Sequence, residues 1–208
     1  QLRQGQYEEA HASLNLLHQK QPKHQKVITM LSEVYQHLGE WQKLLDLLPV
    51  LRKIGQLPND SADQLELTAY EGLLQQLGKQ EGSHGLQVYW NKMARKFKAE
   101  PRLIAAIGKQ LIAFDDHNAA KIILLNAMKK SAPDTILTVV GQLNLSDYKD
   151  VLSSLTQAQK KFAPSATLES VLGLCLAKAG DKDAAVQAYQ RAIELSPHAA
   201  DYYQLGLL

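Results

Sequence analysis

The chain has 208 residues, of which 45 % are hydrophobic and 21 % charged, a balance typical of an ordinary helical protein. The formal net charge of +2 is too small for the concentrated basic stripe of a nucleic-acid-binding protein, so no nucleic-acid partner is expected. The single cysteine, Cys175, cannot form an internal disulfide, and its apolar neighbours Leu174 and Leu176 predict a small buried thiol.

Apolar residues recur at helical spacing along the chain, and no segment alternates as a strand would, so the sequence predicts an all-α fold. In chain order, helices are expected at 6–20, 25–38, 41–54, 62–77, 85–98, 102–114, 117–131, 135–144, 147–161, 166–179, 182–195 and from 199 onward. Two stretches rich in Gly, Pro, Ser and Asn, 55–61 and 78–85, are expected to be irregular connections, the second more flexible. Ser61, followed by Gln64, is expected to start a helix.

Residues 166–199 fit one 34-residue helical hairpin. Gly173 is expected to let the two helices cross closely, because a Cβ there would hold their backbones apart. Gly180 is expected to end the first helix in a left-handed conformation, and Asp181 to cap the second. The second helix carries a small-and-aromatic face and closes on a proline, formed by Ala185, Tyr189, Ala192 and Pro197. This is the tetratricopeptide pattern.

The same skeleton recurs along the chain. Gly5 and Gly39 are 34 residues apart, as are Tyr7 and Trp41. The prolines that mark later boundaries, Pro101, Pro133, Pro164 and Pro197, are separated by 32, 31 and 33 residues. The sequence therefore predicts one tetratricopeptide-type α-solenoid of antiparallel hairpins over 1–208, wound as a right-handed superhelix. Regular repeats are expected at 1–60 and at 99–208, with the last one truncated, and a longer irregular hairpin at 61–98.

The sequence contains no motif that indicates catalysis or metal binding. It has no nucleophile elbow, phosphate-binding loop or glycine-rich dinucleotide turn, so no enzymatic activity and no catalytic residue are expected. Asp116, in the pair Asp115-Asp116, is a natural helix N-cap, which explains the pair better than acid–base chemistry. The seven histidines (11, 18, 24, 37, 84, 117 and 198) lack acidic or cysteine neighbours at metal-ligand spacing, so neither metal nor cofactor is expected.

In solenoids of this type the first helix of each hairpin lines the concave face. We expect exposed, partner-binding residues at Lys26, Thr29, Glu33, Gln36 and His37, at Arg102, Ala105, Lys109 and Ile112, and at Thr167, Ser170, Leu174 and Lys178. This mixed polar surface with basic points suits an extended or helical peptide. It lacks the paired Lys and Asn arrangement that clamps a terminal carboxylate in chaperone-binding repeats.

Residues 89–98 (YWNKMARKFK) carry a second candidate surface. Tyr89, Trp90, Met93 and Phe97 fall on one side of a helix, and Lys92, Arg95, Lys96 and Lys98 largely on the other. A basic amphipathic helix can lie on an anionic membrane or bind an acidic partner. The favoured alternative is that the aromatic side packs inward and the cations are solvated.

Three stretches carry a more specific resemblance: GEWQKLLDLLPVLRKIGQL at 39–57, LTAYEGLL at 67–74 and YWNKMARKFKAEPRLIAAIGKQLI at 89–112. They resemble the C-terminal region of the proteobacterial HemY-like proteins. The resemblance implies an inner-membrane protein with a cytoplasmic repeat domain, attached through N-terminal spans that this chain lacks. It also implies an association with later steps of haem biosynthesis, without an established reaction. The flavin-dependent oxidase that shares the name elsewhere needs a dinucleotide turn, which is missing here.

Together these features predict a protein-binding scaffold whose partners are tetrapyrrole-pathway enzymes at the inner membrane. Direct binding or carriage of porphyrin or haem is the alternative from another class. A general envelope-assembly repeat protein and an enzyme completed by residues outside this chain are further alternatives. The unpaired helix at 202–208 adds the hypothesis of a homodimer.

Overall fold

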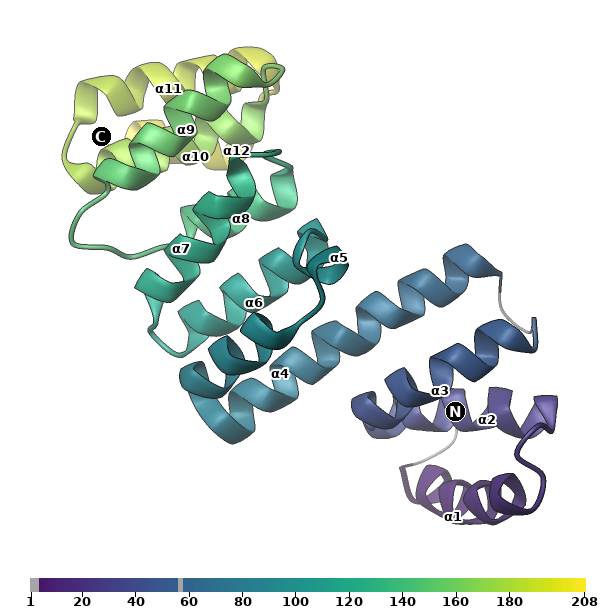
Figure 1. Cartoon of the computed structure of the whole chain (residues 1–208). Helices are drawn as coiled ribbons and strands as arrows, with labels where there is room; N and C mark the ends of the chain where they lie inside the picture. Colours follow the sequence, from purple (N-terminus) through teal and green to yellow (C-terminus); the bar gives the residue numbers. More distant parts are fainter. Residues whose placement is uncertain (1–3, 56–57) are drawn as a thin grey trace. The chain divides into compact units, whose positions relative to one another are not determined.

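The computed structural model describes residues 4–55 and 58–208, which are largely helical and contain no β-strand (Figure 1). The all-α prediction is therefore confirmed. Residues 56–57 of the expected 55–61 connection, and residues 1–3 of the first expected repeat, lie outside this description. The chain divides into two compact units, the first ending at Leu77 and the second beginning at Gly78. The boundary falls inside the 61–98 segment expected to be irregular.

The first unit consists of stacked helices around an aliphatic core. Its helices are α1 (Gln4–Lys20), α2 (Gln25–Leu38), α3 (Trp41–Lys53) and the part of α4 (Asn59–Lys92) that precedes Gly78. α2 packs on both α1 and α3. It begins where the His24 ring accepts a hydrogen bond from the Val27 N–H (3.4 Å) and ends at Gly39, whose φ of 70° is left-handed. Both helix ends therefore have local causes.

The second unit repeats the hairpin arrangement. After the end of α4 it contains α5 (Arg95–Lys98), α6 (Pro101–Ala113), α7 (His117–Met128), α8 (Asp134–Gly141), α9 (Lys149–Lys161), α10 (Ala166–Ala179), α11 (Lys182–Leu195) and α12 (Ala199–Gly206). α6 packs on α7, and α10 packs on α11, while α8 contacts both α6 and α10 (Figure 1). The first helices of consecutive hairpins thus share one layer.

The hairpin expected at 166–199 has the predicted details. Gly180 ends α10 with φ 90°, and the Asp181 carboxylate accepts a hydrogen bond from the Ala184 N–H (3.2 Å) at the start of α11. A Cβ built on Gly173 would lie 3.1 Å from ring atoms of Tyr189. This distance is tighter than ordinary van der Waals contact, so any larger residue at 173 would require the Tyr189 ring to move.

The connection expected at 78–85 is instead helical on both sides of one residue. Only Gly82 has non-helical angles within α4 (φ 64°, ψ −161°), in the left-handed region that favours glycine. Gly85 packs against the Glu81 side chain, because a Cβ on Gly85 would lie 2.2 Å from the Cβ of Glu81. The expected loop is therefore reduced to a helix break at one residue.

The helix before this break, α4, starts at Asn59 rather than near Ser61, so the predicted cap is wrong.

Two further helix boundaries differ from prediction. The helix expected over 85–98 breaks after Lys92 and resumes as the single turn α5, so 89–98 is not one amphipathic helix. The helix expected over 135–144 ends at Gly141, because side chains from elsewhere take the carbonyls that follow. Tyr148 donates its hydroxyl to the Leu143 carbonyl (2.8 Å), and the Lys178 ammonium donates to the same carbonyl (2.7 Å).

Gly173→Ala is expected to destabilise the second unit by about 1–3 kcal/mol, because the added methyl must displace the buried Tyr189 ring. Urea denaturation followed by circular dichroism measures the change. Gly206→Ala is the matched control, since nothing lies within 4 Å of a Cβ there and its φ is not left-handed. Equal stability of the two variants would show that α10 and α11 do not depend on this contact.

Cys175 is expected to be inert to iodoacetamide in the folded chain and to react once the chain is unfolded. The residue is 0 % exposed, and burial raises the pKa of its thiol to about 11, so little of the reactive thiolate forms at pH 8. Mass spectrometry of alkylated samples, with and without urea, measures this. Rapid alkylation without urea would contradict the buried position.

Candidate functional site

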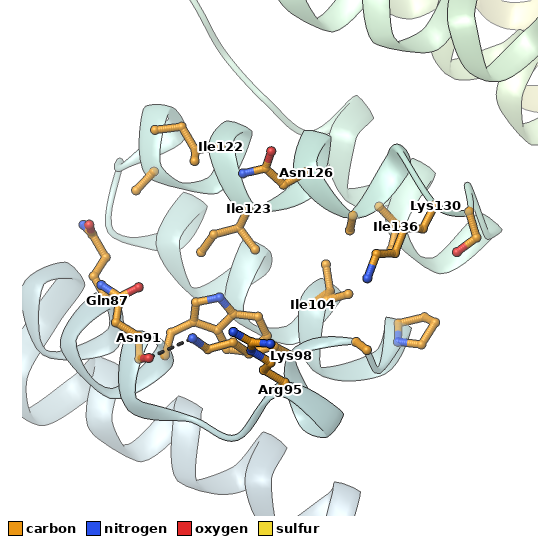
Figure 2. Close-up of a pocket in the computed structure, with 16 residues that line it drawn as sticks. Gln87, Asn91, Arg95, Lys98, Ile104, Ile122, Ile123, Asn126, Lys130 and Ile136 are labelled. Atoms are coloured by element: carbon orange, nitrogen blue, oxygen red, sulfur yellow. Dashed lines mark hydrogen bonds between the residues drawn. The ribbon is translucent and has the colours of Figure 1, made fainter.

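A groove of about 630 Å³ lies on the second unit, along α7 and opposite the junction of α4 and α5 (Figure 2). Sixteen residues line it: Gln87, Trp90, Asn91, Arg95, Lys98, Ala99, Pro101, Ile104, Ala119, Ile122, Ile123, Asn126, Ala127, Lys130, Ser131 and Ile136. Its charged lining residues are all cations, from Arg95, Lys98 and Lys130. We call this feature the cationic groove.

The single turn α5 positions two of these cations. Phe97 is buried (8 % exposed) and draws the turn onto α6, which it contacts. Arg95 and Lys98 stand three residues apart, on one face of the turn, and both line the groove. The Lys98 ammonium donates a hydrogen bond to the Asn91 carbonyl (2.7 Å), which holds its side chain across the end of α4 (Figure 2).

The opposite wall is one complete stripe of α7. Its lining residues within the helix are Ala119, Ile122, Ile123, Asn126 and Ala127, at spacings of three and four that place them on a single face. The eight helical steps from Ala119 to Ala127 span about 12 Å. Ile122 is 60 % exposed although it is a large apolar side chain, whereas Trp90 in the floor is 7 % exposed. The groove therefore has an apolar interior with an uncovered edge.

Asp116 fixes the two walls against each other. One carboxylate oxygen accepts hydrogen bonds from the Ser83 hydroxyl and from the Gln87 side-chain amide (2.8 Å), both on α4. The other accepts from the Ala119 N–H at the start of α7 (3.1 Å), which confirms the predicted N-cap. One side chain thus joins the end of α4 to the first turn of α7 and sets the width of the groove.

In the first unit, several residues expected on the concave face already have structural contacts. Lys26 and Glu33 are exposed on α2. Thr29 donates its hydroxyl to the Gln25 carbonyl (3.1 Å), and Gln36 donates to the Ser32 carbonyl (3.1 Å), both within their own helix. His37 stacks on the Tyr7 ring, with centroids 4.3 Å apart.

The α6 and α10 sets of the second unit are less open than expected. Ala105 is 6 % exposed, so the expectation that it is exposed is wrong. It is one of the buried residues of α6. Lys109 is exposed, and Arg102 and Ile112 are half-buried. Thr167, Leu174 and Ser170 of α10 are likewise half-buried.

Two polar residues of the α10 set have partners within the fold. Ser170 donates its hydroxyl to the buried carboxylate of Asp201 on α12. Lys178 donates to the carbonyls of Gly141 (2.9 Å) and Leu143 (2.7 Å), and burial lowers the pKa of its ammonium. These contacts close the end of α8 and join α12 to α10.

The expected basic surface at 92–98 divides into two parts. Arg95 and Lys98 line the groove, whereas Lys92 and Lys96 do not. The Lys96 ammonium instead lies 4.2 Å from the centroid of the Phe97 ring. Trp90 and Phe97 are buried, as the inward-packing alternative predicts.

No sequence pattern predicted the isoleucines or Lys130 of the groove. Ile104, Ile122, Ile123 and Ile136 come from three different helices, so no local spacing joins them. One signal was available in the sequence. Ile122 and Ile123 are adjacent apolar residues, so α7 carries more apolar surface than its contact with α6 needs. Within the described residues, no group of three or more His, Cys, Asp or Glu side chains could hold a metal ion. No helix in those ranges is long and apolar enough to span a bilayer.

Comparisons with known proteins agree with the helical architecture. A tetratricopeptide-repeat family model matches residues 141–200. The HemY proteins of Escherichia coli strain K12 and of Shigella flexneri are each 30 % identical to this chain over 185 residues, or 89 % of it. The chain is a tetratricopeptide-repeat relative of HemY. It spans about half of the HemY sequences, since the match covers 46 % of their length.

Two solved structures are also similar. One is YrrB, described as a TPR protein with an unusual peptide-binding site, at a TM-score of 0.49 and 14 % identity, covering 94 % of this chain and 98 % of YrrB. The other is a tetratricopeptide repeat protein from Parabacteroides merdae ATCC 43184, at a TM-score of 0.41 and 15 % identity, covering 99 % and 78 %. Tetratricopeptide repeats form surfaces for protein partners, so the HemY relative is a helical-repeat interaction module.

Asp116→Ala is expected to destabilise the second unit by at least about 1–2 kcal/mol, since the α7 cap and two bonds to α4 are lost together. Asp183→Ala, an exposed residue in the first turn of α11, is the control and should change stability by less than about 0.5 kcal/mol. Urea denaturation measures both. A loss no larger than the control's would mean that Asp116 does not hold the groove walls.

Proposed function

We propose that the chain is a non-enzymatic scaffold that binds protein partners, and that it serves haem and porphyrin biosynthesis at the bacterial inner membrane. The observation that carries the proposal is the 30 % identity to HemY, which extends over 185 residues and so includes both units. The similarity therefore covers the successive helical hairpins and is not limited to one repeat.

The proposed mechanism is binding to a surface that is rigid before the partner arrives. Within each unit, stacked hairpins fix the first helices in place, which lowers the entropic cost of ordering an interface. Lys26 and Glu33 are exposed on α2 in the first unit, and Lys109 is exposed on α6 in the second. Such charged side chains contribute more to the choice of partner than to the affinity for it.

The proposed partners are tetrapyrrole-pathway enzymes, and the proposed site of action is the cytoplasmic face of the inner membrane. Membrane attachment in this proposal belongs to segments of the full protein that precede the repeats, as in the HemY-like family. The support is the family relationship, because the repeats themselves would fit any peptide of matching shape and charge.

The test is a pull-down from detergent-solubilised inner membrane with the full-length protein as bait. The double variant Lys26→Glu/Lys109→Glu is compared with Lys20→Glu/Lys160→Glu, which carries the same charge change at exposed lysines of α1 and α9. We expect quantitative mass spectrometry to find tetrapyrrole enzymes retained by the parent and the control, and reduced at least about fivefold with the first variant.

Two outcomes would contradict this proposal. Retention of the same enzymes by both variants would exclude the first-helix surface as their binding site. Saturable one-to-one binding of protoporphyrin in an absorbance titration, together with no specific protein partner, would favour the ligand-binding alternative.

A further inference from the structure

We propose that the cationic groove is a second docking surface, which binds an acidic amphipathic helix of a partner protein. It lies along α7, the second helix of its hairpin, and is distinct from the first-helix surface of the proposed function. Both inferences involve a protein partner, but the experiment below tests the groove without reference to the pull-down.

The apolar part of the groove requires a partner with an apolar face. Trp90 and Ile104 provide a buried floor, while Ile122 remains 60 % exposed at the edge. Covering an exposed apolar side chain with another apolar surface is favourable, because it removes that surface from water. Within the described residues no other segment of the chain covers Ile122. A partner that lies along α7 would bury it.

The charge of the groove selects an acidic partner. Arg95 and Lys98 stand on the α5 side, Lys130 stands beyond the end of α7, and no carboxylate lines the groove. Asp116, at the start of α7, already accepts three hydrogen bonds, one of them as the helix cap. Arg95 and Lys130 form no ion pair with any carboxylate in the described ranges. Carboxylates of a bound segment would therefore meet cations that have no competing partner.

The shape favours a helix over the other anionic occupants. The α7 stripe repeats at three- and four-residue spacing and runs for about 12 Å before Lys130, which matches two to three turns of a helix laid alongside. A bilayer is too flat to enter a recess whose floor is the buried Trp90. A small amphiphilic anion would fit the floor but would leave the exposed edge of Ile122 in water.

The test is a fluorescence-anisotropy titration of the chain with a labelled 16-residue amphipathic peptide. Its leucines repeat at three and four residues, and its flanking positions are glutamate; matched peptides carry glutamine or lysine there. We expect saturable one-to-one binding of the glutamate peptide. Arg95→Glu/Lys130→Glu should weaken it at least about tenfold, and the lysine peptide should then bind this variant better than the parent.

Two control variants locate the binding site. Lys20→Glu/Lys160→Glu changes the net charge equally and should bind like the parent. Lys109→Glu alters the first-helix surface and should also leave peptide affinity unchanged. In methyl NMR spectra the signals of Ile122 and Ile123 should shift on binding, while that of Ile193 on α11 should not. Circular dichroism confirms that each variant is folded.

Several results would overturn the assignment. These are the absence of binding, equal binding of all three peptides, and a loss of affinity in Lys109→Glu with none in Arg95→Glu/Lys130→Glu. Phosphatidylglycerol vesicles or protoporphyrin that bind in place of the peptide, with the same dependence on Arg95 and Lys130, would assign the groove to a membrane surface or a small anion. The pull-down result for the first-helix surface would stand in each case.

Discussion

The packing of a glycine against an aromatic ring underlies the stacking of helices in both units. In the second unit Gly173 of α10 meets the Tyr189 ring of α11, and in the first unit a Cβ on Gly72 would lie 2.2 Å from the Trp41 ring. In each pair the glycine leaves room for an aromatic ring that a larger residue would displace. The hairpins can then stack, and their stacking buries apolar faces that a lone hairpin would leave in water.

The same stacking uses many of the polar groups that a surface would otherwise present. Glu169 is buried, and its carboxylate accepts hydrogen bonds from Gln159 (2.5 Å) and Arg191 (2.8 Å), which ties α9 and α11 to α10. Ser170 and Lys178 likewise bond to neighbouring elements. Because a buried polar group is costly without a partner, these side chains serve stability first. The polar surface left for binding is correspondingly smaller.

Local sequence signals predicted most helices and several of their ends, because caps such as Asp181 and the left-handed Gly180 act within one turn. The expected loop at 78–85 failed for a local reason, because the helix breaks at Gly82 alone. Two other predictions failed where residues outside the local pattern decide the outcome: Ala105 is buried by the neighbouring packing, and α8 is cut short by Tyr148 and Lys178. The cationic groove could not be predicted for the same reason, since α4, α5, α6, α7 and α8 must assemble before its lining residues meet. Arg95 and Lys98 were identified as basic, but not as one wall of a groove.

The two proposed surfaces would give the scaffold separate positions for partners, one on the first helices and one along α7. The most direct measurement is photo-crosslinking in cells, with benzoylphenylalanine placed at Lys109, at Ile122, or at the exposed Lys160 as a control, in the full-length protein. The account predicts defined protein adducts at the first two positions and none at the control. Equal crosslinking at all three positions, or none at any, would contradict the scaffold.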